Sequence, residues 1–274
     1  MARTRSSKES TDNTATASTK NLNEDSSAKQ SAKVPSKRKV ADKKAEPEAA
    51  EPSSKRSKTN VSKPSDKVEK LIQGYGAVPL VDYGLKDSES PTPETVLAHV
   101  FNAMLTSARI SHELAEKSVV CMIEAGYANI KTLEKSSWQE RTEVLTKGGY
   151  TRYREKTATG LGDLTKLIMD KYDGDLNKLR EKADDDPEKI RALIKEIKGF
   201  GDVGCNIFTD TAQYVWPCLA PYIDPRSIKT AEAIGIETDV DKLYEIVGRD
   251  HKQMARLCVA LTNIRLNKKE SEFS

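Results

Sequence analysis

None of the 15 aromatic residues of this 274-residue chain precedes Tyr75. Residues 1–65 hold 15 Lys and Arg against 8 Asp and Glu, a net charge of +7, whereas residues 66–274 hold 30 against 34, a net of −4. A segment without aromatic residues, rich in Ser, Lys, Thr, Ala and Glu, cannot bury enough apolar area to offset the entropy of an ordered chain. We therefore predict that residues 1–65 are a disordered basic tail.

The sequence lacks the signatures of several protein classes. No apolar run approaches the roughly 20 residues of a membrane-spanning helix, and the first residues lack the apolar core of a secretory signal. Four scattered cysteines, at Cys121, Cys205, Cys218 and Cys258, favour a reducing compartment over a disulfide framework or zinc ribbon. A phosphate-binding P-loop motif is also missing. We expect no membrane span, no metal site and no cofactor.

Two short basic clusters lie in the tail, separated by a spacer rich in Glu, Ala and Pro. They consist of Lys37, Arg38 and Lys39, and of Lys55, Arg56 and Lys58. This arrangement matches a bipartite nuclear-import signal, whose lysines reach acidic grooves on an import receptor. A nuclear protein with an import receptor as partner is predicted, and a solvated basic linker is the alternative. Such an arm also adds salt-dependent affinity for DNA phosphates.

The chain after the tail carries helix signals in close succession. Thr92 and Pro93 provide an N-cap and a proline at the first helical position. Ser137 and Glu140 have the spacing of a capping box, and we expect that helix to turn Trp138 inward. Apolar residues recur with helical period, and no segment shows sustained alternation of period 2. The fold class is predicted to be all-α.

These signals divide the chain into segments. Residues 92–266 are expected to form a bundle of about ten helices joined by short loops. Residues 66–91 are less regular and are expected to pack on the bundle as an extended arm. A disordered C-terminus is expected over residues 267–274. A monomer is expected.

The most informative stretch runs from Ile197 to Gly204 between two predicted helices. A helix, a glycine-containing turn and a second helix form a helix–hairpin–helix. Glycines let the backbone turn tightly and bring its N–H groups against a phosphate, and the second helix adds its dipole. The alternative is a plain helix–loop–helix turn. The predicted DNA contacts of this hairpin are Lys198, Gly199, Phe200, Gly201, Val203 and Gly204.

Downstream of this hairpin, Trp216-Pro217 and the segment 220–224 (Ala-Pro-Tyr-Ile-Asp) precede another helix start. Here the chain resembles the helix–hairpin–helix (HhH-GPD) DNA glycosylase superfamily, of which endonuclease III is the familiar member. That family pairs such a hairpin with an aspartate at the head of the following helix. Segments 105–109 and 149–156 resemble its first-helix and loop motifs. The resemblance covers residues 92–266 and implies an HhH-GPD DNA glycosylase-like bundle.

The resemblance makes Asp224 the candidate catalytic residue. Cleavage of an N-glycosidic bond builds positive charge on the sugar as the base leaves. A carboxylate beside C1′ stabilises that charge and can activate a water molecule. The base must first leave the stack and enter a pocket. Asp224 followed by Pro225 is also a good helix N-cap, so a purely structural role is the alternative.

The chain departs from the family pattern at three points. Val203 stands where bifunctional members carry a Schiff-base lysine, so β-lyase activity by that route is not expected. Only Cys258 follows Asp224, so the iron–sulfur cluster of endonuclease III is not expected. Asp202 would repel a phosphate at the hairpin, although it could cap the second helix.

Two further regions are candidates for DNA contact. Arg109 occupies a position where the family often places an amide side chain that fills the gap left by a flipped base, and a surface arginine is the alternative. The other region interleaves aromatic rings and cations in a pattern that suits the minor groove. Its alternative is a core tyrosine beside a solvated helix face. The residues of this region are Tyr150, Arg152, Tyr153, Arg154 and Lys156.

These features together predict a nuclear base-excision-repair protein that binds double-stranded DNA. The leading hypothesis is a monofunctional glycosylase that hydrolyses the N-glycosidic bond of a damaged or mispaired base through Asp224. The alternative is a catalytically inactive protein of the same fold that binds DNA or a lesion. A third interpretation treats the bundle as a protein-interaction module.

Overall fold

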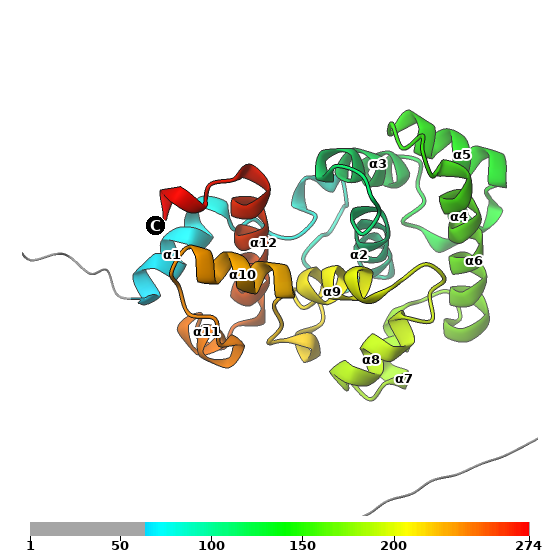
Figure 1. Ribbon diagram of the computed structural model, residues 1–274. Coiled ribbons are helices and arrows are strands. Elements are labelled where there is room, and N and C mark those ends of the chain that lie inside the picture. The colour runs from blue at the N-terminus through cyan, green and yellow to red at the C-terminus, as the bar shows by residue number, and fades with distance from the viewer. Residues whose placement is uncertain (1–63, 274) are drawn as a thin grey trace, which may run out of the picture. The chain divides into compact units, whose positions relative to one another are not determined.

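The computed structural model describes residues 64–273, and the predicted tail with its two basic clusters lies outside them. The described part contains helices and loops and no strand, which confirms the all-α prediction (Figure 1). Its α-helices are α1 (Pro64–Tyr75), α2 (Pro93–Thr106), α3 (His112–Glu124), α4 (Ile130–Lys135), α5 (Trp138–Lys147), α6 (Arg154–Tyr172), α7 (Asn177–Lys182), α8 (Pro187–Ile194), α9 (Asp202–Ala212), α10 (Pro225–Ala233), α11 (Val240–Ile246) and α12 (His251–Asn267). Single 3-10 turns are η1 (Val81–Tyr83), η2 (Pro217–Leu219) and η3 (Glu270–Glu272).

The helices form two groups, each around an apolar core (Figure 1). Helices α2 to α9 enclose the larger core. In it the rings of Phe208 and Trp216 pack edge to face, with their centroids 5.6 Å apart. Helices α1, α10, α11 and α12 enclose the smaller core around Leu71 and Leu257. Because α12 packs against α9 as well as α1 and α10, it joins the two groups.

The predicted helix starts are largely confirmed by their caps. The Thr92 side chain accepts a hydrogen bond at the N-terminus of α2, and Ser137 forms the capping box with Glu140. Trp138 differs from the expectation, because its side chain is exposed rather than buried. It is the first residue of α5, and its indole N–H donates to the Thr159 hydroxyl of the adjacent α6 at 3.1 Å. The capping box therefore sets the start of α5 without placing Trp138 in the core.

The first half of the predicted extended arm is helical, which corrects the sequence-based expectation for residues 66–91. Helix α1 packs along α12. Its buried side chains, Val68, Leu71 and Ile72, recur at the spacing of one helix face. Residues 76–92 lack an α-helix and contain the short turn η1.

The C-terminal end also departs from the predicted disorder of residues 267–274. Helix α12 extends to Asn267, and η3 follows it. The Phe273 ring meets the Tyr75 ring edge-on at 5.8 Å, and the Phe273 carbonyl accepts a hydrogen bond from Lys67 at 3.2 Å. The end of the chain is therefore bound to α1, and Ser274 lies outside the described residues.

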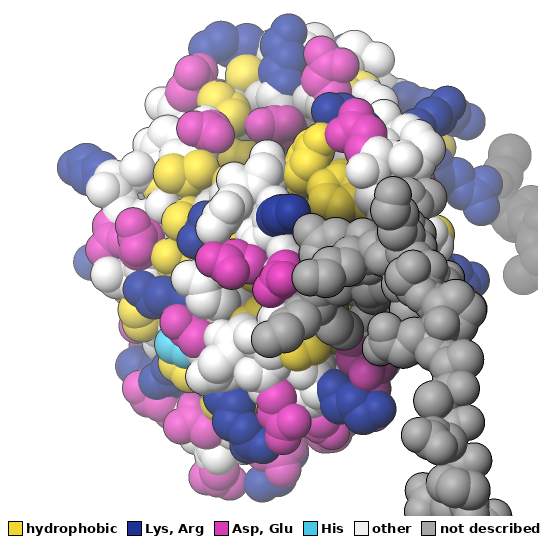
Figure 2. All heavy atoms as spheres, turned by 90° about the vertical axis from the view of Figure 1, so that its left-hand side faces the viewer, with side chains coloured by type: hydrophobic (Ala, Val, Ile, Leu, Met, Phe, Trp, Pro, Cys, Tyr) yellow, Lys and Arg dark blue, Asp and Glu magenta, His cyan; other side chains and the backbone are white. Residues whose placement is uncertain are grey.

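The surface charges of this part are mixed. Figure 2 views it from the side of α1 and α11, and the visible face intersperses Lys and Arg with Asp and Glu. This pattern agrees with the small net charge of −4 counted over residues 66–274. An affinity of this part for DNA must therefore come from local groups.

Replacing Leu71 by Ala tests the attachment of α1. Leu71 is fully buried against α12, so its truncation should lower the free energy of unfolding by about 2–5 kcal/mol. Denaturant unfolding of the full chain measures this loss. The neighbouring exposed Lys70→Ala is the control and should change stability by less than about 0.5 kcal/mol. Equal effects of the two variants would contradict the packing described for α1.

Candidate active site

The predicted helix–hairpin–helix is formed by α8, the turn 195–201 and α9. Gly199 adopts φ +92°, a conformation that side-chain-bearing residues rarely take, so this turn depends on glycine. Gly201 is the N-cap of α9 and offers no side-chain cap. The first intrahelical bond runs from Cys205 N–H to the Gly201 carbonyl at 3.0 Å. The amide groups before Cys205 therefore form a helix N-terminus suited to an anion.

The charged side chains of the hairpin are paired within the protein. Asp202 is the first residue of α9 rather than its cap, and its carboxylate pairs with Lys195 at 2.6 Å. Lys198 donates to Asp163 of α6 at 2.9 Å. The Asp202 charge is thus partly neutralised. Lys198, a predicted DNA contact, must exchange its carboxylate partner to reach a phosphate.

A cleft of about 970 Å³ lies between the two groups of helices. Residues 77–83 form one part of its lining, and the end of α2, the starts of α3 and α10, one side of α9 and the C-terminal part of α12 form the rest. Val203 and Ile207 of α9 line it, so the hairpin borders the cleft directly. Asp224, Arg226 and Arg265 also line it. Asp224 and the hairpin, which the sequence analysis singled out separately, therefore share one cavity.

Asp224 is the N-cap of α10, as its sequence context predicts. Its Oδ1 accepts hydrogen bonds from the backbone N–H and the side-chain Nε of Arg226 at 2.7 and 2.9 Å. Its Oδ2 accepts from Arg226 Nη2 at 2.8 Å. Burial raises the pKa of the Asp224 carboxyl, but the hydrogen bonds and charge of Arg226 outweigh burial and hold the pKa below its ordinary value. The carboxylate is thus ionised and clamped by a bidentate arginine.

The loop that carries Asp224 is attached to α9 by two buried polar side chains. Asp210 Oδ1 accepts the backbone N–H of Asp224 at 2.9 Å. The Gln213 amide donates to the Tyr222 carbonyl at 2.9 Å and accepts the Tyr222 N–H at 3.2 Å. Because Asp210 and Gln213 lie three positions apart, they share one face of α9. The helix that begins at the hairpin therefore also fixes the position of the candidate catalytic residue.

Asp210 lies in an unusual environment for a carboxyl group. It is almost completely buried, and burial raises its pKa from 3.8 to about 7. The nearby negative charge of Asp224 also raises the pKa, whereas the Asp224 backbone N–H lowers it. Burial also raises the pKa of the neighbouring Cys258 thiol. The site therefore holds one ionised carboxylate beside a second carboxyl that titrates near neutrality.

The other predicted contact residues differ in exposure and in their distance along the chain from the cleft. Arg109 is exposed in the loop between α2 and α3, beside two residues that line the cleft. The rings of Tyr150 and Phe200 are buried in the larger core, and the assignment of the two residues as DNA contacts stays a prediction. Burial of a ring among apolar neighbours leaves it no surface for a base. Gly204 is also buried, where an added Cβ would lie 3.3 Å from the Phe200 ring.

The rest of the 150–156 region lies apart from the cleft, because none of its residues lines that cavity. The guanidinium carbon of Arg152 lies 5.1 Å from the centroid of the Tyr153 ring, and Tyr153 packs against the core. Arg154 donates a long 3.4 Å bond to the Thr146 hydroxyl, and Lys156 is exposed. These contacts agree with the alternative of a core tyrosine beside a solvated helix face. The three cations remain candidates for phosphate contact.

Sequence reasoning missed Asp210, Gln213, Arg226 and Arg265. For Asp210 and Gln213 a signal exists, since two polar residues interrupt the apolar face of α9. Arg226 is two positions after an N-cap aspartate, where its backbone and side chain can both reach the carboxylate. No local pattern marks Arg265, because only the packing of α12 brings it to the cleft.

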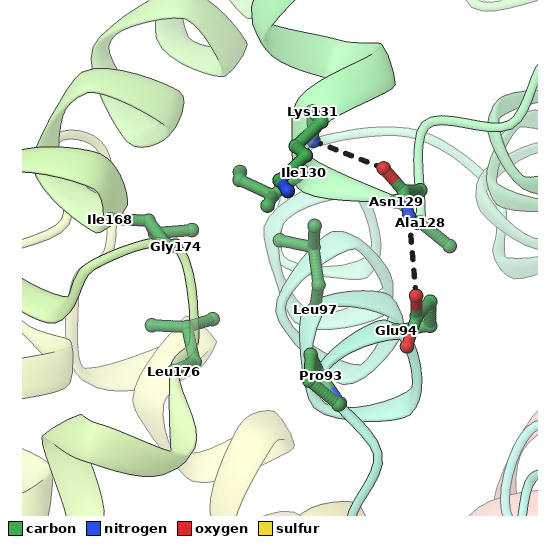
Figure 3. Close-up of a pocket in the computed structure, with 10 residues that line it drawn as sticks. All are labelled: Pro93, Glu94, Leu97, Ala128, Asn129, Ile130, Lys131, Ile168, Gly174 and Leu176. Carbon is green, nitrogen blue, oxygen red and sulfur yellow. Dashed lines mark hydrogen bonds between the residues drawn. The ribbon is translucent and has the colours of Figure 1, made fainter.

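A smaller cavity of about 210 Å³ lies between the N-termini of α2 and α4 and the end of α6 (Figure 3). Glu94 accepts a hydrogen bond from the Asn129 side-chain amide at 3.3 Å. The Asn129 side-chain oxygen in turn accepts from Lys131 N–H at 3.1 Å and caps α4. Because these polar groups are engaged in helix capping, we assign this cavity no chemistry.

Residues 64–273 contain no group of three or more His, Cys, Asp or Glu placed to hold a metal ion. Within the same range, every helix is too short or too polar to cross a membrane.

Comparison with known proteins yields a structural similarity. The sequence matches no family model and no curated protein. The fold is similar to that of H. pylori 3-methyladenine DNA glycosylase (MagIII) in a crystal structure bound to 1,N6-ethenoadenine. The two chains share 15% sequence identity, the similarity covers 75% of this chain and 98% of the other, and the TM-score is 0.45. We therefore derive the function from the cleft itself.

Replacing Asp210 by Asn should change how stability depends on pH. The folded protein keeps the Asp210 proton up to about pH 7, whereas an ordinary aspartate releases it near 3.8. The contribution of Asp210 to stability is therefore full below about pH 4 and is lost as pH rises through 7. Thermal unfolding at pH 5 and pH 8 should show wild type losing several degrees relative to Asp210→Asn. An exposed control, Asp241→Asn, should follow wild type at both pH values. A parallel response of Asp210→Asn and wild type would contradict the assignment.

Proposed function

We propose that this protein is a monofunctional DNA glycosylase that hydrolyses the N-glycosidic bond of a damaged or mispaired base in double-stranded DNA. One observation carries the proposal: the clamped, ionised carboxylate of Asp224 lines a cleft that the hairpin residue Val203 also lines. The hairpin proposed to bind phosphate and a carboxylate suited to sugar chemistry thus border one cavity. The resemblance of the 197–224 segment to the HhH-GPD superfamily supports the same activity.

The proposed reaction uses the ionised form of Asp224. As the C1′–N bond breaks, the bonding electrons leave with the base and positive charge develops on the sugar. The negative charge of Asp224 stabilises that sugar cation, and its oxygen can accept a proton from the attacking water. Water forms the new C1′–O bond, and the departing base takes up a proton. Asp210 and Gln213 hold the loop in place, because they bind Asp224 and Tyr222 through the backbone.

Absence of lyase chemistry is part of the proposal. The residues that line the cleft include no lysine, and Val203 occupies the position at which bifunctional relatives in the superfamily carry the Schiff-base lysine. A valine cannot form an imine with the sugar. The product is therefore an abasic site in an intact strand.

Nuclear location, an import receptor as partner and a monomeric state remain proposals. The basic clusters at 37–39 and 55–58 support nuclear import, and both lie outside the described residues. The same clusters supply positive charge for nonspecific affinity toward DNA, whereas residues 66–274 are net acidic.

A second candidate function, binding of DNA without cleavage, is favoured by the pairing of Asp224. The Asp224 side chain is only 3% exposed and pairs with Arg226 at 2.8 Å. An arginine held in this way neutralises the carboxylate that hydrolysis requires. If the pair persists when DNA binds, the protein recognises a lesion and does not release the base.

Asp224→Asn distinguishes the two functions. We expect wild type to release a base from at least one member of a duplex panel with uracil, deaminated, oxidised or alkylated bases, including 3-methyladenine and 1,N6-ethenoadenine. Loss of the negative charge should reduce single-turnover release at least about 100-fold, while Asn preserves the N-cap and the fold.

Asp239→Asn is the matched control, because Asp239 is also a helix N-cap aspartate and does not line the cleft. It should retain full base release. Equal activity of wild type and Asp224→Asn would eliminate the proposed mechanism. Lesion-selective DNA binding without base release across the panel would establish the second function.

Incubation of the protein with a duplex that contains an abasic site tests the absence of lyase chemistry. Borohydride reduces any imine to a stable protein–DNA adduct. We expect no adduct and no strand cleavage above the level without protein, because no lysine lines the cleft. A trapped adduct in gel electrophoresis would overturn the monofunctional assignment.

A further inference from the structure

Two arginines are the only Lys or Arg side chains among the residues that line the cleft. Arg226 follows Asp224 at the start of α10, and Arg265 lies near the C-terminal end of α12. The lining residues from α3 include His112, Glu113 and Glu116. Within the cleft, an anion can therefore be attracted by Arg226 and Arg265, whereas the lining carboxylates repel it.

Arg265 is a cation without a strong partner. Its Nε is buried and forms no hydrogen bond with a described residue. Its Nη2 donates a long 3.5 Å bond to the Thr262 hydroxyl, and no salt bridge among the described residues includes it. Burial lowers the pKa of Arg265 and the positive charge of Arg226 lowers it further, whereas the negative charges of Asp224, Asp210 and Glu270 raise it and do not offset burial. A partly buried guanidinium without a salt bridge or a short hydrogen bond is stabilised when an anion reaches it.

Arg226 holds Asp224 but remains accessible to solvent. Its side chain is 42% exposed, whereas that of Asp224 is 3% exposed. The side chain of Arg226 can therefore leave the carboxylate and turn outward, while its backbone N–H keeps the N-cap bond to Asp224 at 2.7 Å. A guanidinium binds a phosphate with the same bidentate geometry with which it binds a carboxylate. An anion beside Arg226 thus competes directly with Asp224.

We propose that Arg226 and Arg265 form a binding site for a backbone phosphate of the strand that carries the extruded nucleotide, and that occupancy of this site transfers the Arg226 side chain from Asp224 to the phosphate. Arg265 gains a direct salt-bridge partner, which it lacks among the described residues. Asp224 loses its clamp at the moment when the nucleotide is in place. The carboxylate is therefore unmasked by DNA and stays neutralised without it. This inference rests on the proposed function for the identity of the ligand.

The test measures binding to a duplex with a tetrahydrofuran abasic analogue, so it requires no base release. Fluorescence anisotropy of the full chain over a series of salt concentrations gives both the affinity and its salt dependence. Each phosphate contact contributes about 0.9 to the slope of log K against log salt. We expect Arg265→Gln to reduce the slope by about 0.9 and to weaken binding about tenfold or more. Arg265→Lys keeps the charge and should restore most of the slope.

Arg249→Gln is the matched control. Arg249 is exposed, pairs with Glu245 at 2.9 Å and does not line the cleft. It should leave the slope unchanged. The phosphate site would be overturned if Arg265→Gln had the same salt-dependence slope as wild type and Arg249→Gln. Unchanged thermal unfolding of the variants shows that they are folded in this comparison. If wild type releases no base from any duplex of the panel while Arg265→Gln still reduces the slope, only the proposed activity is overturned.

Transfer of Arg226 is tested in a background without the Asp224 charge. Arg226→Gln in Asp224→Asn protein should reduce the slope by a further 0.9 or so, relative to Asp224→Asn alone. An unchanged slope would show that Arg226 does not reach the phosphate and would overturn the transfer. Inorganic phosphate at constant ionic strength distinguishes the source of the anion. Phosphate binding that depends on Arg265, without any effect of Arg265→Gln on DNA, would overturn the assignment to a DNA strand.

Discussion

The attachment of the 222–224 loop to α9 is the constraint on which the candidate site depends. Asp210 binds the Asp224 backbone at 2.9 Å, and Gln213 binds Tyr222 through both atoms of its amide. Helix α9 begins at the hairpin and ends beneath this loop. One helix therefore determines the separation between the candidate phosphate-binding turn and the candidate catalytic carboxylate. A site built on a helix keeps this geometry better than a site that depends on two loops.

This attachment has an electrostatic consequence. Burial of Asp210 favours its neutral form, and the nearby Asp224 charge acts in the same direction. Arg226 meanwhile keeps Asp224 ionised. The two neighbouring carboxyls thus take different charge states because their environments differ, as is typical of sites where one carboxylate acts on a charged intermediate. The same arginine that holds the pKa of Asp224 low also pairs with its carboxylate. The proposed activity therefore depends on the position of the Arg226 side chain.

Local signals in the sequence predicted most of the helix starts, because an N-cap side chain binds backbone N–H groups within the next few residues. Thr92, Ser137 and Asp224 start their helices as expected. The helical nature of α1 was missed, although Val68, Leu71 and Ile72 have the spacing of one helix face. In the site, the hairpin and Asp224 were predictable from a contiguous motif. Arg265 was not, because it reaches the cleft only through the packing of α12 against α9 and α10.

The distribution of charge limits which residues could carry the proposed recognition of DNA. Residues 66–274 are net acidic, and two hairpin-region lysines, Lys195 and Lys198, are already paired with carboxylates. A long-range positive field is therefore not available from this part of the chain. Beside the cleft, the remaining groups are the amide N–H groups at the start of α9 and the guanidinium groups of Arg226 and Arg265. Both kinds of group act over a few ångströms. They therefore bind a distorted strand that reaches them in preference to a regular duplex.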